Sequence, residues 1–118
     1  MNLTIRTAQM AKARFIPDAL DITVKSGDPC FAPTWSMVMG YKDGSLTEAD
    51  YTEAYTRLMR QSLKDNPDRW LQVAQSRTVT FLCYCKAGTF CHRYILVDLM
   101  TKYAKSIGID VFYAGEYL

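Results

Sequence analysis

The sequence lacks long apolar runs, and none of its segments approaches the roughly 20 apolar residues that a membrane-spanning helix needs. Its first residues, Met1 to Arg6, also lack the apolar segment of a secretory signal peptide. Repeats, low-complexity stretches and linkers are absent as well. These absences argue against a membrane protein and predict a single domain over residues 1–118, located in the cytoplasm.

A strong excess of charge is missing too. The chain has 14 Lys and Arg residues against 12 Asp and Glu residues, so its net charge is only +2. We therefore expect neither nucleic acid nor a membrane as a partner. Aromatic residues make up 13% of this short chain and leave apolar surface to cover, which predicts a homo-oligomer.

Histidine and cysteine are scarce, with one and four residues. Three of the cysteines nevertheless fall in one short segment, from Cys83 to Cys91, directly before the only histidine, His92. Cytoplasmic thiols stay reduced, and such crowding fits a functional site better than a disulfide framework. The segment from Cys83 to Arg93 is therefore the candidate site.

Hydrophobic periodicity and turn residues predict alternating strands and helices. The expected strands are 3–8, 19–25, 77–83 and 110–113, and the expected helices are 36–41, 47–64, 67–76 and 91–106. Thr47 and Asp50 match a capping box, and Pro67 suits a first helical turn. The short helix 67–76 should turn Trp70, Leu71 and Ala74 inward. This alternation predicts a small three-layer α/β domain with a mainly parallel, Rossmann-like sheet.

The candidate site lies in a loop between an expected strand and an expected helix, where open α/β sheets bind ligands. Unpaired N–H groups and the dipole at the helix start attract anions, and Arg93 and Lys86 add positive charge. Gly88 would let the backbone approach a ligand. The same field should lower the pKa of the thiols, most of all that of Cys91.

The loop after the neighbouring strand should complete the pocket. Phe31 or Trp35 could stack on a base, Tyr51 and Tyr55 could point into the same cleft, and Glu116 could meet a ribose hydroxyl. The predicted ligand-binding residues are Lys25, Ser26, Trp35, Cys83, Lys86, Gly88, Thr89, His92, Arg93 and Glu116. The predicted catalytic residues are Cys85, Cys91 and His92, and no metal ligand and no cofactor are predicted.

Three functions compete for this loop. The first is binding of a phosphate-bearing, nucleotide-like small molecule. The second is a cysteine-dependent enzyme, a nucleotide or glycosidic-bond hydrolase or transferase, with Cys91 or Cys85 as nucleophile and His92 as base. The phosphatase spacing of Cys, five residues and Arg is absent, because Ala87 stands at the cysteine position. The third is a zinc-stabilised interaction module using the three cysteines and His92, although the spacing is not that of Cys-x2-Cys knuckles.

The run Leu82-Cys83-Tyr84-Cys85 followed by Cys91-His92-Arg93 resembles the small bacterial and phage proteins of the domain of unknown function 488 family. The likeness covers roughly residues 19–106; this chain is shorter than the usual members, and Cys85 and Lys86 stand near where many relatives have an acidic residue. The resemblance implies a fold like that of nucleotide-handling α/β domains, with the site at this loop. By analogy with phage-borne members it implies a role in sequestering a host nucleotide signal.

Overall fold

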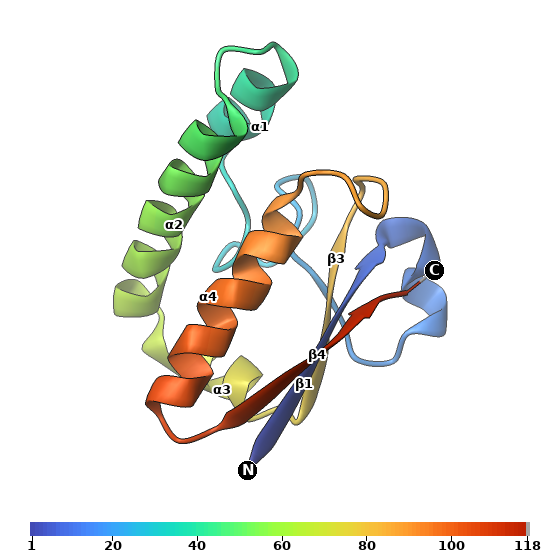
Figure 1. Ribbon diagram of the computed structural model, residues 1–118, viewed down its shortest axis with the longest axis vertical. Helices are drawn as coiled ribbons and strands as arrows, with labels where there is room; N and C mark the ends of the chain where they lie inside the picture. Colours follow the sequence, from blue (N-terminus) through green and yellow to red (C-terminus); the bar gives the residue numbers. More distant parts are fainter. Residues whose placement is uncertain (118) are drawn as a thin grey trace.

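The computed structural model describes residues 1–117 as one α/β domain built on a four-stranded, all-parallel sheet (Figure 1). The strands are β1 Asn2–Gln9, β2 Ala19–Asp21, β3 Thr78–Cys83 and β4 Asp110–Glu116. The helices are the 3-10 helix η1 Met10–Phe15 and the α-helices α1 Trp35–Lys42, α2 Glu48–Asp65, α3 Pro67–Ala74 and α4 His92–Ser106. The predicted Rossmann-like fold class is confirmed, and the strands and α-helices follow one another in the predicted order.

The strand order β2-β3-β1-β4 puts β2 and β4 at opposite edges of the sheet. β3 lies between β2 and β1, and its residues Val79 to Cys83 are buried because α-helices cover one face of the sheet and η1 covers the other. This explains the nearly continuous apolar run, which is typical of a central parallel strand. Because all four strands are parallel, the segments that follow β2, β3 and β4 leave the same end of the sheet.

The layers on the two faces of the sheet differ in size. The larger hydrophobic core joins the inner faces of α2, α3 and α4 to Leu3, Ile5 and Phe81 of the sheet. The smaller core lies under η1 on the opposite face and contains Leu82. The third layer of this domain is therefore one short 3-10 helix, which the sequence analysis did not predict.

Local sequence signals set the ends of the helices. The Thr47 side chain accepts a hydrogen bond from the Asp50 N–H, and the Asp50 carboxylate accepts one from the Thr47 N–H, forming the predicted capping box. Pro67 occupies the first turn of α3, also as predicted. The prediction that Leu71 points inward is wrong, because this residue is 36% exposed and Val73 is the buried residue instead.

The predicted strand 19–25 is too long, because β2 ends at Asp21. The Asp21 carboxylate accepts hydrogen bonds from the N–H and the hydroxyl of Thr23, at 2.9 and 2.7 Å, and from the Ser26 hydroxyl. A side chain that binds the backbone two residues on turns the chain out of the strand. A Cβ at Gly27 would lie 2.4 Å from the Thr23 nitrogen, so this tight turn requires glycine.

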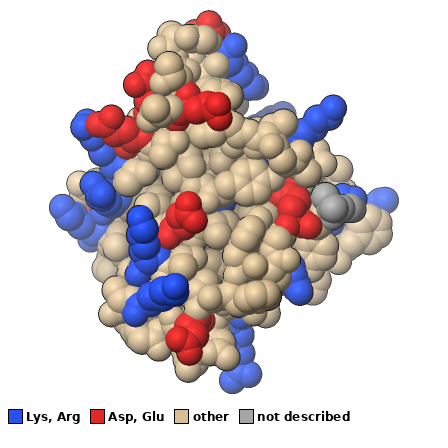
Figure 2. Space-filling model, in the orientation of Figure 1, with Lys and Arg blue, Asp and Glu red and all other residues tan. Residues whose placement is uncertain are grey.

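The surface in Figure 2 shows Lys and Arg side chains standing among Asp and Glu side chains, without one continuous basic band. This face therefore lacks the extended positive surface that nucleic-acid-binding domains commonly present. None of the helices described here is both long enough and apolar enough to span a lipid bilayer.

Candidate functional site

The main pocket lies at the end of the sheet where β2 and β3 finish, the place where open α/β sheets bind ligands. Its volume is about 560 Å³, within the range of small-molecule sites. The wall is built from the segment after β2, helices α1 and α2, and the loop between β3 and α4. The lining residues are Thr23, Val24, Lys25, Pro33, Trp35, Val38, Tyr41, Lys42, Tyr51, Cys83, Tyr84, Cys85, Lys86, Thr89, Phe90, Cys91 and His92.

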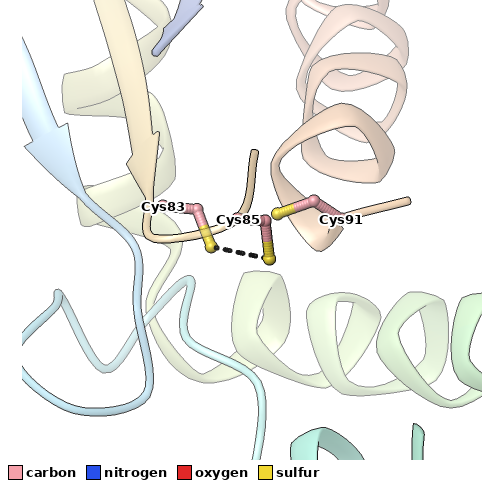
Figure 3. A group of neighbouring side chains, drawn as sticks. All are labelled: Cys83, Cys85 and Cys91. Atoms are coloured by element: carbon pink, nitrogen blue, oxygen red, sulfur yellow. Dashed lines mark hydrogen bonds between the residues drawn. The ribbon is translucent and has the colours of Figure 1, made fainter. Parts of the chain in front are cut away.

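Three cysteine sulfurs meet in this wall. Cys83 ends β3, Cys85 lies in the following loop, and Cys91 is the N-cap of α4 (Figure 3). The Cys83 and Cys85 Sγ atoms are 3.7 Å apart, and all three sulfurs lie within 4.8 Å of one another. Cys83 and Cys91 are buried, whereas Cys85 is exposed. Together they form a thiol cluster that is open to the pocket on one side and could hold a metal ion.

Contacts within the thiol cluster separate the pKa values of its members. Hydrogen bonds with Cys85 and Cys91 lower the pKa of Cys83, since they favour its thiolate. The hydrogen bond with Cys83 raises the pKa of Cys91, and burial adds to that rise. The prediction that the helix start lowers the pKa of Cys91 most of all is therefore wrong, because sulfur–sulfur contacts outweigh the helix terminus.

His92 is 5% exposed and lines the pocket from the first turn of α4. Its Nε2 lies 2.7 Å from the carbonyl oxygen of Ile22, just after β2. A carbonyl can only accept a hydrogen bond, so Nε2 carries the proton and Nδ1 keeps a lone pair in the neutral ring. Nδ1 lies 3.7 Å from the Cys91 sulfur and is the ring atom available to the thiol cluster.

Arg93 turns away from the pocket. Its side chain is fully buried, and its Nε and Nη2 donate to the Glu116 carboxylate of β4 at 3.3 and 3.0 Å. Nη2 also reaches the Tyr94 hydroxyl at 3.0 Å and the Lys86 carbonyl at 3.3 Å. Nη1 is buried and has no hydrogen-bond partner in residues 1–117. Arg93 and Glu116, both predicted to bind the ligand, therefore do not line this pocket.

The Arg93–Glu116 pair instead fixes the loop between β3 and α4. Besides the bond from Arg93 to the Lys86 carbonyl, the Gly88 N–H donates to the Tyr94 hydroxyl at 3.1 Å. Gly88 has a φ of 79°, in the left-handed region that favours glycine. Gly88, a predicted ligand-binding residue, does not line the pocket, and its positive φ lets the chain turn in this loop.

The structure brings most of the predicted site residues together. The predicted site residues that line the pocket are Lys25, Trp35, Cys83, Cys85, Lys86, Thr89, Cys91 and His92. Ser26 is not among them, because its hydroxyl donates to the Asp21 carboxylate at 2.5 Å. Phe31 and Tyr55 are also absent from the wall: Phe31 packs on Trp70 with ring centres 5.2 Å apart, and the Tyr55 hydroxyl donates to the Phe31 carbonyl.

Sequence reasoning missed a small aromatic wall of the pocket. Tyr41 and Phe90 have ring centres 5.0 Å apart, and each also contacts Tyr51. Lys42, at the end of α1, adds a third lysine to the lining. The signal was available, because a helix of aromatic and apolar residues in a long Gly- and Pro-rich segment commonly covers a site.

In the comparison with known protein families, the model described as "Active DUF488-N3 subclade" matches residues 5–104, which is most of the chain. The matched range includes the thiol cluster, His92 and Arg93. Comparison with curated proteins and comparison with solved structures each gave no match.

Proposed function

The chain belongs to the domain of unknown function 488 family, and from that premise we propose that its pocket binds a phosphate-bearing, nucleotide-like small molecule. The observation that carries the proposal is the composition of the pocket wall. Three lysines, Lys25, Lys42 and Lys86, line it without a single Asp or Glu. The rest of the wall is mainly apolar and aromatic. Such a wall suits a ligand with one anionic part and one flat, apolar part.

The flat part of the ligand would lie against Trp35. This side chain is 56% exposed at the start of α1 and makes no aromatic contact with another described residue. A base stacked on an aromatic ring gains about 1–3 kcal/mol. The Tyr41–Phe90 contact is already made within the fold, so those rings close the wall while Trp35 offers a free face.

The anionic part of the ligand would lie near Lys25 and Lys86, which approach the pocket from the segment after β2 and from the loop after β3. Neither lysine forms an ion pair within residues 1–117, so their charges are free for a ligand. The low net charge of the whole chain matters little for these two lysines, because salt screens charges that lie more than about 10 Å from the pocket. In this proposal the protein holds its ligand and releases it unchanged, as a sequestering protein would.

A second candidate function is cysteine-dependent catalysis, favoured by the thiol cluster in the wall. Hydrogen bonds with Cys85 and Cys91 lower the pKa of Cys83 and so favour its thiolate form, close to His92. A thiolate can attack an electrophilic carbon of a bound nucleotide, forming a C–S bond as the leaving group departs with the bonding electrons. Water would then cleave the C–S bond, releasing the product and restoring the thiol, so that the overall reaction is hydrolysis.

Calorimetry with three probes tests the binding proposal. We expect a nucleoside monophosphate to bind more tightly than either the matching nucleoside or inorganic phosphate, since it alone uses both halves of the wall. Lys25→Ala should weaken binding, and the exposed Lys102→Ala, in α4 and away from the pocket, serves as the charge-matched control. Equal, negligible heats for all three probes would contradict the proposal.

Mass spectrometry of the probe after long incubation separates the two candidate functions. Binding alone returns the nucleotide intact after heat release. Catalysis consumes it, and replacing Cys83 by serine abolishes the consumption while leaving the calorimetric binding in place.

A further inference from the structure

The thiol cluster has the geometry of a metal site. Around a tetrahedral zinc ion with Zn–S bonds of 2.3 Å, sulfur ligands stand about 3.8 Å apart. The Cys83 and Cys85 sulfurs are 3.7 Å apart, and the third sulfur, of Cys91, lies within 4.8 Å of both. A modest closing movement of Cys91 would therefore complete three corners of a tetrahedron.

The protein ligands come from three separate elements, which hold the sulfurs in place before any ion arrives. Cys83 is fixed by its strand, Cys91 by the start of α4, and Cys85 by the loop between them (Figure 3). That loop is held by hydrogen bonds to the Arg93–Glu116 pair and to Tyr94. The exposed Cys85 gives an ion access from solvent.

The surrounding charges suit a negatively charged metal–thiolate group. Three thiolates and one Zn²⁺ carry a net charge of −1, and the pocket wall offers Lys25 and Lys86 with no carboxylate. On the other side of the loop lies the fully buried guanidinium of Arg93, whose Nη1 has no partner in the described chain. Because Glu116 already offsets the charge of Arg93, the net stabilisation of the thiolates comes mainly from the lysines, which have no ion pair in residues 1–117.

We propose that Cys83, Cys85 and Cys91 bind one Zn²⁺ ion and leave its fourth coordination position open to the pocket. Three protein ligands and one open position are typical of zinc sites that take an exogenous ligand, whereas structural sites are closed by four protein ligands. This site goes beyond the proposed nucleotide binding and does not depend on it. Occupied sulfurs would also be unavailable as free nucleophiles, so the site opposes the second candidate function.

Titration of the reduced, metal-free full-length chain with Co²⁺ and then Zn²⁺ tests the proposal. We expect one equivalent of Co²⁺ to give the sulfur-to-cobalt charge-transfer absorption of a thiolate site, and one equivalent of Zn²⁺ to remove it. Adding a small thiol should shift the visible cobalt bands, because it enters the open position. Absence of the charge-transfer absorption overturns the proposal, and unshifted bands overturn the open position.

Serine variants locate the ligands. Replacing Cys83, Cys85 or Cys91 should weaken Zn²⁺ binding by at least about 100-fold. Loss of a residue that only hydrogen-bonds to a metal ligand already costs about 10–100-fold in affinity. Cys30→Ser is the matched control, because Cys30 lies outside the thiol cluster, and it should leave the affinity unchanged. Equal losses in all four variants, or loss in only one cluster variant, would contradict the site. If a variant fails to fold, the cobalt spectrum of the unmodified chain decides whether the metal site exists. Nucleotide calorimetry is a separate test, because the zinc site does not depend on nucleotide binding.

Discussion

His92 and Arg93 are consecutive residues at the start of α4, yet they reach opposite edges of the sheet. His92 contacts the Ile22 carbonyl beside the edge strand β2, and Arg93 pairs with Glu116 of the other edge strand, β4. Only His92 lines the pocket. The expected cationic cradle is thus divided into a pocket-facing residue, His92, and an anchoring residue, Arg93, which holds the loop that carries Cys85 and Lys86.

The division follows from helix geometry. Consecutive residues on an α-helix point about 100° apart, so His92 and Arg93 can reach different neighbours from one turn of α4. Hydrogen bonds of Arg93 and Tyr94 hold the loop that carries Cys85 without a disulfide. Mutations of the Arg93 anchor should therefore act through stability, and mutations of the pocket wall through the affinity for the proposed ligand.

The largest expected effect is on the Arg93 anchor. Arg93→Ala should lower the free energy of unfolding by about 3–5 kcal/mol, because it leaves the Glu116 carboxylate unpaired in a largely buried position. Urea denaturation of the variant measures this loss. The exposed Arg60→Ala is the matched control and should change stability by less than about 0.5 kcal/mol. Equal stability of Arg93→Ala and the unmodified chain would show that the pair is not an anchor.

The next largest expected effect is on ligand binding in the pocket. Trp35→Ala should weaken nucleoside monophosphate binding by about 1–3 kcal/mol, or roughly 5- to 150-fold, with the fold unchanged because the ring is 56% exposed. Calorimetry and circular dichroism measure the two quantities. Phe112→Ala, also exposed but on β4 away from the pocket, is the control. An equal loss in both variants would remove Trp35 from the binding site.

Acid should weaken the anchor through Glu116. Burial disfavours its charged form, but hydrogen bonds from Arg93 and Tyr94 outweigh burial and hold the pKa of Glu116 below its ordinary 4.5. A carboxyl group whose pKa is lower in the folded chain stabilises the fold above the unfolded pKa, and this contribution disappears as the pH falls through the folded pKa. The stability difference between the unmodified chain and Glu116→Gln should therefore shrink below pH 4.5. A difference that is constant from neutral pH into acid would contradict this role.

The smallest expected effect concerns a single exposed charge. Lys86→Ala should weaken nucleotide binding only a few-fold, because an exposed ammonium interacts through screening solvent. The loss should fade as salt is added, which calorimetry at two ionic strengths would measure. Lys86→Ala keeps the backbone carbonyl that Arg93 binds, so the anchor remains intact. A salt-independent loss would point instead to a collapsed loop.

Much of the fold could be predicted because its signals are local. Thr47 with Asp50, Pro67, and the apolar run ending at Cys83 each mark an element through neighbouring residues. The length of β2 could not be predicted, because the hydrogen bonds of the Asp21 side chain override the β-branched residues that follow. The prediction of thiols and lysines around one pocket came from their spacing along the strand–loop–helix unit.

The direction of Arg93 was not predictable from the motif alone, because its partner Glu116 is distant in sequence. The pKa order of the cysteines failed for a similar reason: contacts among Cys83, Cys85 and Cys91 decide it, and the helix terminus has less effect. Tertiary packing decides which distant residues pair and how clustered side chains contact one another, and the spacing of residues in the sequence does not specify these contacts.

The most direct test of the central claim is to follow the backbone amide signals of the labelled chain by NMR while a nucleoside monophosphate is added. The account predicts saturable shifts at the pocket-lining residues Trp35, Lys86 and Phe90, including the Trp35 indole N–H, with smaller changes at Arg93 and Glu116. Shifts centred on Arg93 and Glu116, or no saturable shifts at all, would contradict it.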